Sequence, residues 1–268
     1  MDGPTISTGL PALGLGTYKN TGEQATESVK TALELGYRHV DTAVYYENEA
    51  AVGAGIEASS VPREEVVVAT KLWYDQLAGG DVVPAARASL DRLGLDSVNL
   101  LYVHWPAGSY EPGETMAAFN ELYDEGLLDS VAVSNFTPDQ LATAQDHSAA
   151  PIVANQVECH PLLQQDELRE YCEAEDVAVV AYAPIARGTV TDVPELTDIA
   201  AKHGASEVQV SLAWLRQHGI AAIPKATSEA HIRANWESQQ LTLDDAEMAT
   251  IDELDREERL IDPGFAAW

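Results

Sequence analysis

Short apolar runs alternate with amphipathic segments along almost the whole chain. The apolar runs predict strands near 12–17 and at 38–41, 66–71, 98–104, 130–134, 152–157, 177–183 and 220–224. The segments between them predict helices at 23–35, 48–58, 82–93, 114–125, 138–147, 165–174, 195–203, 206–217 and 228–237. Continuously apolar strands are typical of parallel sheets that are buried on both faces.

Eight strands, each followed by a helix, predict an α/β fold of the closed (β/α)₈ or TIM-barrel type. A doubly wound open sheet is the alternative. Residues 2–11 predict a β-hairpin that plugs the lower end of the barrel, and 244–255 predict an extra helix outside it. No linker or low-complexity stretch interrupts the 268 residues. We therefore expect a single domain over 1–268.

Two helix starts carry capping signals. Thr21 and Gln24 have the spacing of a capping box. Thr137 is followed by Pro138 and Gln140, which predicts a box with proline at the first helical position.

The chain is strongly acidic, with 44 Asp and Glu against 15 Lys and Arg and a net charge of −29. This charge disfavours nucleic acid and anionic membranes as partners, since both require cationic patches. The acids are scattered over predicted helices and loops, and we interpret them as adaptation to a molar-salt cytoplasm, where the Debye length is about 3 Å. Dialysis to low salt should then lower the melting temperature, and unchanged stability would contradict this interpretation.

The cysteine content, the N-terminus and the apolar runs together indicate where the protein is located. Cys159 and Cys172 are the only cysteines, which excludes a disulfide scaffold. The N-terminus lacks the pattern of a signal peptide, and the longest apolar run, 177–186, contains a proline and is too short to cross a bilayer. We expect a cytoplasmic protein.

Some motifs favour ordinary structural roles. Residues 53–58 match a dinucleotide fingerprint but fall inside a predicted helix, so the glycines there are interpreted as helix-packing residues. Cys159 and His160 have no second pair at ligand spacing, and no metal is expected. The partnerless histidines are predicted to lie at the surface or to be loosely paired: His39, His147, His203 and His218.

Asp41, Lys71 and His104 each stand at the end of a predicted strand, and Tyr46 lies in the loop after Asp41. Charged groups at the ends of apolar strands are costly unless they are paired. The strand ends of a parallel barrel meet at one mouth, so these four side chains are expected to gather there.

This set of side chains suits the reduction of a carbonyl beside a nicotinamide, where negative charge builds on oxygen. Tyr46 is the candidate proton donor, and a nearby Lys71 ammonium is expected to lower its pKa from about 10. Asp41 would hold Lys71 charged and oriented. His104 would donate a hydrogen bond to the same oxygen.

Residues 41–49 resemble the D-T-A-x-x-Y-x-N-E signature of the aldo-keto reductase family. The resemblance continues through residues 70–73, 101–106, 133–136, 155–161, 181–184 and 223–225. It implies a TIM-barrel reductase that uses NAD(P)H without a Rossmann motif, with the catalytic roles given above. It also implies that Ser134, Asn135 and Gln156 hold the nicotinamide carboxamide and that Tyr182 stacks on its ring.

The resemblance assigns the rest of the cofactor site to Gly16, Thr17, Lys225, Thr227, Ser228, His231 and Asn235. The sequence departs from the family at Ala226, where serine is usual, and at His231, where arginine is usual. In the family, the usual serine and arginine bind the 2′-phosphate of NADP. Arginine can bind a phosphate bidentately and histidine cannot. NADP(H) is the family default, NAD(H) is also plausible, and Thr227, Ser228 and Arg233 are available for compensation.

The expected substrate walls are Tyr18, Trp73, His104 and Trp105, with Trp268 as a further candidate. Aromatic walls suit small aldehydes, α-keto compounds or keto-sugars. The short chain resembles prokaryotic members of the diketogluconate or glyoxal reductase type, and a monomer is expected. The alternatives are a sugar or alcohol dehydrogenase working in the reverse direction and a non-catalytic nicotinamide-binding regulatory module.

Overall fold

A computed structural model describes residues 3–254 and 256–268. Its sheet has eight parallel strands in chain order: β1 (Leu15–Gly16), β2 (His39–Asp41), β3 (Val67–Leu72), β4 (Val98–Val103), β5 (Leu128–Ser134), β6 (Ile152–Glu158), β7 (Ala178–Tyr182) and β8 (Ala221–Ala222). Parallel bridges from Leu13 to Ala222 and from Gly16 to Lys225 join the last strand to the first. The (β/α)₈ prediction is confirmed, and the open sheet is excluded.

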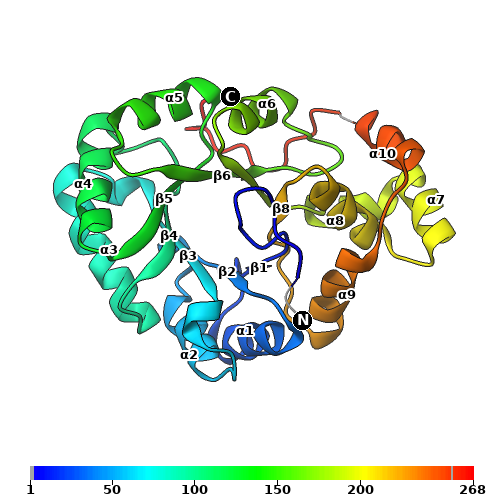
Figure 1. Cartoon of the computed structure of the whole chain (residues 1–268), viewed down its shortest axis with the longest axis horizontal. Helices are drawn as coiled ribbons and strands as arrows, with labels where there is room; N and C mark the ends of the chain where they lie inside the picture. Colours follow the sequence, from blue (N-terminus) through cyan, green and yellow to red (C-terminus); the bar gives the residue numbers. More distant parts are fainter. Residues whose placement is uncertain (1–2, 255) are drawn as a thin grey trace.

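Helices surround the barrel (Figure 1). They are α1 (Gly22–Leu35), α2 (Glu49–Glu57), α3 (Gly79–Leu93), α4 (Pro112–Asp124), α5 (Pro138–His147), α6 (Asp166–Ala174), α7 (Pro194–His203), α8 (Glu207–Gln217), α9 (Glu229–Glu237) and α10 (Asp245–Asp252). A large apolar core fills the space between sheet and helices. A second core of mostly small residues fills the barrel itself. The two cores explain why the strands are apolar on both faces.

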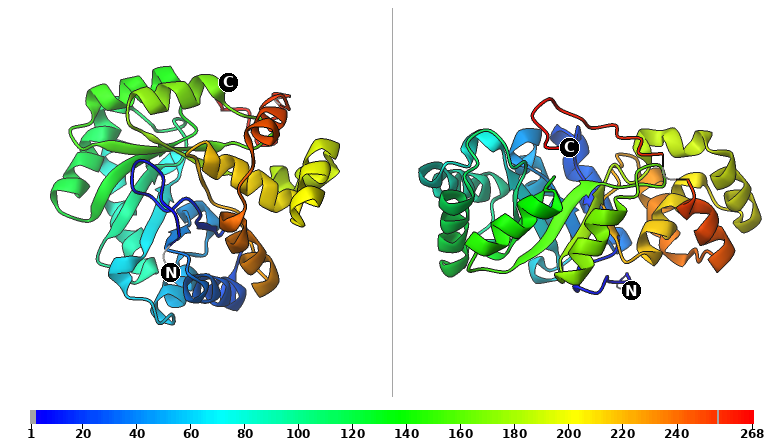
Figure 2. Two further views of the ribbon diagram at one scale, coloured as in Figure 1. Left: turned by 45° about the vertical axis from the view of Figure 1, so that its right-hand side comes forward. Right: turned by 90° about the horizontal axis from the view of Figure 1, so that it is seen from above.

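The N-terminal segment closes one end of the barrel. Thr5 pairs antiparallel with Pro11, and the amide of Ile6 donates to the carbonyl of Leu10 at 2.9 Å. Ile6 is buried in the inner core beside Leu100 and Tyr102. The segment and the C-terminal residues lie at opposite ends of the barrel (Figure 2, right). The expected hairpin and the extra helix, α10, are confirmed, except at residues 2 and 255, which lie outside the described residues.

One of the two expected capping boxes forms. Thr137 Oγ1 accepts from the amide of Gln140 at 3.3 Å, and Gln140 Oε1 accepts from the amide of Thr137 at 3.1 Å. The box predicted at Thr21 is wrong, because that side chain makes no capping bond. The chain enters α1 through Gly22 at φ 53°, a left-handed turn that the capping box does not use.

The glycines of α2 are required for helix packing, as predicted. A β-carbon at Gly53 would overlap the carbonyl of Leu93 in α3. One at Gly55 would lie 2.7 Å from the carbonyl oxygen of Thr26 in α1. The fingerprint-like glycines therefore allow α2 to approach both neighbouring helices.

The histidine predictions hold with one exception. His147 is exposed, and His203 and His218 pair with Glu247 and Asp252, each at 2.8 Å. His39 is wrongly predicted: it is fully buried, and its ring nitrogens have no hydrogen-bond partner within the described part of the chain. Burial is the largest cause that lowers its pKa from 6.5 to about 4.

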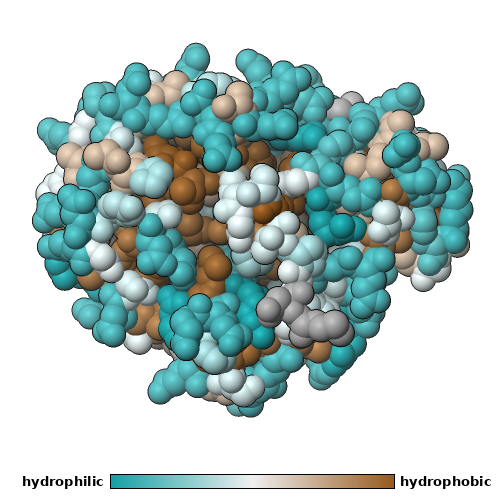
Figure 3. All heavy atoms as spheres, viewed as in Figure 1, coloured by the Kyte–Doolittle hydropathy of each residue, from teal (hydrophilic) through white to brown (hydrophobic). Residues whose placement is uncertain are grey.

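Hydrophilic residues dominate the rim of the face in Figure 3, and hydrophobic ones gather toward its middle. Among the residues that the structure describes, no helix has the length and apolarity needed to cross a membrane.

Candidate active site

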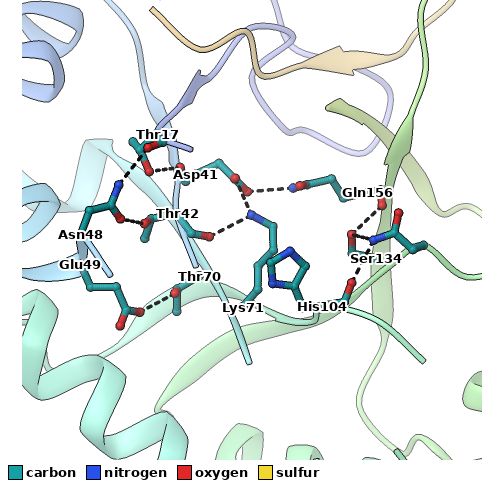
Figure 4. Close-up of polar contacts among 11 residues, drawn as sticks. Thr17, Asp41, Thr42, Asn48, Glu49, Thr70, Lys71, His104, Ser134 and Gln156 are labelled. Carbon is teal, nitrogen blue, oxygen red and sulfur yellow. Dashed lines mark hydrogen bonds and ion pairs between the residues drawn. The ribbon is translucent and has the colours of Figure 1, made fainter. Parts of the chain in front are cut away.

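Asp41, Lys71, His104 and Tyr46 lie together at the carboxyl end of the barrel. Lys71 Nζ lies 2.5 Å from Asp41 Oδ1 and 2.8 Å from the carbonyl oxygen of Thr42 (Figure 4). It is 5.1 Å from the centre of the Tyr46 ring, and that ring meets the His104 ring edge-on at 5.8 Å. The parallel register of β2, β3 and β4 produces this arrangement, since it brings successive strand ends to one mouth.

The Lys71–Asp41 pair is almost completely buried, with exposed side-chain fractions of 0% and 1%. Burial lowers the pKa of Lys71, while the charge of Asp41 and its hydrogen bond oppose that change. The short contact and the bond to Thr42 provide the compensation that buried charges require.

The pKa of Tyr46 differs from the expectation. It is raised well above 10, first by burial and then by the charge of Asp41. The expected net lowering by Lys71 is not found, because burial of the phenol and the negative charge of Asp41 both act in the opposite direction. Tyr46 is therefore a protonated phenol at neutral pH, the form that a proton donor needs.

His104 is neutral at pH 7. Burial and the nearby Lys71 charge lower its pKa well below 6.5. Its Nδ1 is buried and has no hydrogen-bond partner among the described residues. A neutral imidazole at this position can donate one hydrogen bond but does not carry a charge into the site.

The residues expected around the carboxamide form one network with the buried pair. Gln156 Nε2 donates to Asp41 Oδ2 at 2.8 Å, and Ser134 Oγ donates to the carbonyl oxygen of Gln156 at 2.7 Å. Asn135 Nδ2 donates to the carbonyl oxygen of His104 at 3.0 Å, and Tyr182 Oη donates to Asn135 Oδ1 at 2.8 Å. Sequence reasoning missed the Gln156–Asp41 bond, which spans the barrel interior.

The remaining polar residues of the signature hold the loop that carries Tyr46. Asn48 Oδ1 accepts from Thr42, and its Nδ2 donates to the carbonyl oxygen of Thr17 at 2.9 Å. Buried Glu49 accepts from Thr70 at 2.6 Å and from Arg92 Nε at 2.8 Å. The bonds to Thr17 and Thr70 fasten the loop to the segment after β1 and to β3 (Figure 4), and the bond from Arg92 joins it to α3.

Gly16 and Thr17 have structural reasons for their identity. A β-carbon at Gly16 would lie 2.5 Å from the carbonyl oxygen of Ile223, so glycine lets β1 approach the strand that closes the barrel. Thr17 is buried, and its Oγ1 donates to the carbonyl oxygen of Asp41 at 2.9 Å. Their assignment to a cofactor site stays a prediction.

The segment expected at the adenosine end follows β8. Ser228 caps α9 by accepting from the amide of His231 at 3.3 Å. Lys225 and His231 are exposed, Thr227 is half-buried, and Asn235 is buried. Arg233, one of the three residues expected to be available for compensation, is paired with Glu229 at 2.8 Å.

Aromatic side chains surround the site, and the expected wall residues are among them. Measured between ring centres, Tyr18 lies 5.1 Å from Tyr46, Trp73 lies 4.8 Å from His104, and Trp105 lies 5.4 Å from Trp268. Two further aromatic residues beside the expected walls were missed. Tyr45 stacks on Trp73 at 4.1 Å, and its position next to Tyr46 was an available signal. Phe265 packs on Trp105 at 5.3 Å, which nothing in the local sequence indicates.

The donor set suits a nicotinamide cofactor. Amide and hydroxyl groups of Ser134, Asn135 and Gln156 stand at the ends of β5 and β6, and the half-exposed Tyr182 ring lies beside them. Within the described residues, no group of three or more His, Cys, Asp or Glu is arranged to hold a metal ion.

Comparisons with known proteins identify the family of this chain. Residues 5–256 match the Aldo/keto reductase family model. The chain is 39% identical to a 9,11-endoperoxide prostaglandin H2 reductase of Trypanosoma cruzi, over 94% of this chain and 90% of that protein. It is also 39% identical to a glyoxal reductase of Bacillus subtilis, over 94% of this chain and 91% of that protein.

Solved structures give the same result. A putative 2,5-diketo-D-gluconic acid reductase B superposes with a TM-score of 0.95 at 35% identity, covering 100% of this chain and 96% of that one. An aldo-keto reductase from a Medee basin deep-sea metagenome library superposes with a TM-score of 0.91 at 34% identity, covering 97% of each. The chain therefore belongs to the aldo/keto reductase family, oxidoreductases that use nicotinamide cofactors to reduce carbonyl groups to alcohols.

Proposed function

We propose that this enzyme reduces small aldehydes, α-dicarbonyls or keto-sugars, with Tyr46 as the general acid. The observation that carries the proposal is the gathering of Tyr46, His104 and the Lys71–Asp41 pair at one aromatic-walled mouth. The relatives that are named as reductases of glyoxal and of diketogluconic acid support this substrate range.

Ser134, Asn135 and Gln156 would hold the nicotinamide, which would supply a hydride for the carbonyl carbon when bound. Neutral His104 donates a hydrogen bond that orients the carbonyl oxygen. Tyr46, protonated at neutral pH, transfers its proton to that oxygen as negative charge develops. Lys71 stabilises the phenolate that Tyr46 leaves behind, and Asp41, itself held by Gln156, keeps the ammonium in place.

A panel of carbonyl compounds tests the proposal. Purified enzyme with NADH or NADPH should oxidise the cofactor in the presence of glyoxal, methylglyoxal, 2,5-diketo-D-gluconate or an aromatic aldehyde, followed by the reduced-nicotinamide absorbance. Failure with every carbonyl, but turnover of a sugar or alcohol with the oxidised cofactor, would identify the reverse reaction as the function. Binding of the cofactor without any turnover would favour the regulatory module.

We also propose that the enzyme accepts both cofactors, with NADPH preferred by less than a hundredfold. Arg233 is already paired with Glu229, a carboxylate in the first turn of α9 that would repel a 2′-phosphate. Glu229→Gln should release Arg233 and lower the Michaelis constant for NADPH about threefold, as expected for an exposed charge, without changing that for NADH.

Steady-state kinetics in molar KCl measure these Michaelis constants, with Glu237→Gln at the other end of α9 as the matched control. A hundredfold preference of the unaltered enzyme for NADPH would contradict dual use. Equal effects of the two variants would contradict the role of the Arg233–Glu229 pair.

The remaining proposals concern the setting of the enzyme. We propose that residues 1–268 act as one barrel domain, as a monomer in the cytoplasm, with small molecules and not nucleic acid as partners. The excess of acidic residues supports the exclusion of nucleic acid.

A further inference from the structure

Glu158, the last residue of β6, lies outside the catalytic set, yet its carboxylate is fully buried and makes three hydrogen bonds. Its Oε1 accepts from His160 Nε2 at 3.1 Å and from the amide of Leu260 at 2.9 Å. Its Oε2 accepts from the amide of Ile261 at 2.9 Å. One side chain at the mouth of the barrel thus binds two successive amides of the C-terminal segment 256–268.

The Glu158 carboxylate is ionised, which suits it to accept these hydrogen bonds. Burial alone would raise the pKa of Glu158, but the hydrogen bonds from His160 and the two amides outweigh burial and keep that pKa below 4.5. Glu158 is therefore ionised at neutral pH, and bonds to a charged acceptor are among the stronger ones in proteins.

The segment 256–268 contains no helix or strand of its own. Its start is joined to the barrel where the amides of Arg256 and Glu258 donate to the carbonyl of Leu162. Beyond Ile261, Phe265 packs on Trp105 and Tyr74, at 5.3 and 4.9 Å. The right panel of Figure 2 shows the segment crossing the end of the barrel that lies opposite the N-terminal hairpin.

The end of the segment carries a second aromatic contact. Trp268 packs on Trp105, and Arg259 stacks on the Trp268 ring at 4.1 Å. Phe265 and Trp268 remain 41% and 39% exposed, so their own burial fixes them only in part. The Glu158 bonds thus lie between the anchored start of the segment and its aromatic end.

We propose that Glu158 is a positioning residue that sets substrate range: it holds the segment 256–268 so that Phe265 and Trp268 form the outer wall of the substrate cleft. The inference rests on the proposed function for its kinetic consequence, whereas the attachment of the segment is independent of it. Substrates long enough to reach the outer wall need the attachment, and three-carbon dicarbonyls do not.

Hydrogen exchange tests the attachment directly. In Glu158→Gln one amide nitrogen replaces an acceptor oxygen, so one of the two backbone donors loses its partner. The amide that loses its acceptor, that of Leu260 or that of Ile261, should exchange at least about tenfold faster than in the unaltered enzyme, with no change in the barrel strands. Glu253→Gln, which removes the same charge from an exposed position beside α10, should leave both amides protected.

Steady-state kinetics test whether the attachment of the segment affects substrate range. In Glu158→Gln the Michaelis constant for an aromatic aldehyde should rise about tenfold, while kcat and the Michaelis constant for methylglyoxal stay within about twofold. A general structural defect would lower kcat for both substrates and would overturn the positioning role. Unchanged exchange at 260 and 261 would overturn the attachment, whatever the enzyme reduces.

A second variant covers the case in which Glu158→Gln does not fold. Ile261→Pro removes one of the two donors and leaves the buried carboxylate and the barrel unaltered. It should reproduce both the faster exchange at Leu260 and the selective rise in the Michaelis constant. Normal kinetics with the aromatic aldehyde in this variant would overturn the proposal. Absence of turnover by the unaltered enzyme would instead contradict the proposed function and leave the exchange result decisive for the attachment.

Discussion

Replacing Tyr46 by phenylalanine should reduce kcat for carbonyl reduction by about 10²- to 10⁴-fold, the usual contribution of a positioned general acid. The variant loses one hydroxyl and keeps the ring that packs on Tyr18 and His104. Binding of the reduced cofactor should be unchanged, because the ring keeps its contacts with Tyr18 and His104. Stopped-flow reduction and cofactor titration by fluorescence separate the two effects.

The adjacent Tyr45 provides the control. It lies in the same turn, is half exposed, and stacks on Trp73 through its ring and not its hydroxyl. Tyr45→Phe should keep kcat within about twofold of the unaltered enzyme. Equal losses in the two variants would mean that the turn, and not the Tyr46 hydroxyl, is required. Full activity of Tyr46→Phe would remove the proposed mechanism.

Replacing Lys71 by methionine should cost about 3–5 kcal/mol of unfolding free energy, since it leaves the Asp41 carboxylate buried without its cation. For a protein of this size, that loss corresponds to a fall in melting temperature of about 10 °C. Calorimetry or a thermal melt followed by circular dichroism measures it. Activity should fall as well, because no ammonium then stabilises the Tyr46 phenolate.

A double variant separates stability from catalysis. Asp41→Asn combined with Lys71→Met removes both charges and should recover most of the lost unfolding free energy. It should not recover kcat. If the double variant regained activity along with stability, the pair would be part of the scaffold only.

Local pattern was sufficient to predict the fold. The continuous apolar strands and the glycine-terminated helices predicted the barrel, because burial on two faces leaves few alternatives for a parallel strand. The same reasoning brought Asp41 and Lys71 together, since a buried lysine needs a partner. It failed at Thr21, where the φ angle of Gly22 decides the helix start, and at His39, whose burial depends on which strand face turns inward.

The parts of the site that depend on long-range geometry were not predictable. The bond from Gln156 to Asp41 crosses the barrel, and the bonds from Glu158 reach a segment about a hundred residues away. The pKa of Tyr46 was predicted in the wrong direction, because burial of the phenol and the charge of Asp41 raise it, and the extent of that burial depends on the tertiary structure. Residue type and spacing carry no information on such distances.

The ring of strands is completed by parts from opposite ends of the chain, where Leu13 meets Ala222 and Gly16 meets Lys225. A nascent polypeptide that has not yet reached Lys225 presents two bare strand edges, which are templates for pairing with other chains. Completion of the ring must wait until most of the polypeptide has left the ribosome. Weakening the pairing between the first and last strands would therefore reduce the yield of folded protein during synthesis more than the activity of each folded molecule.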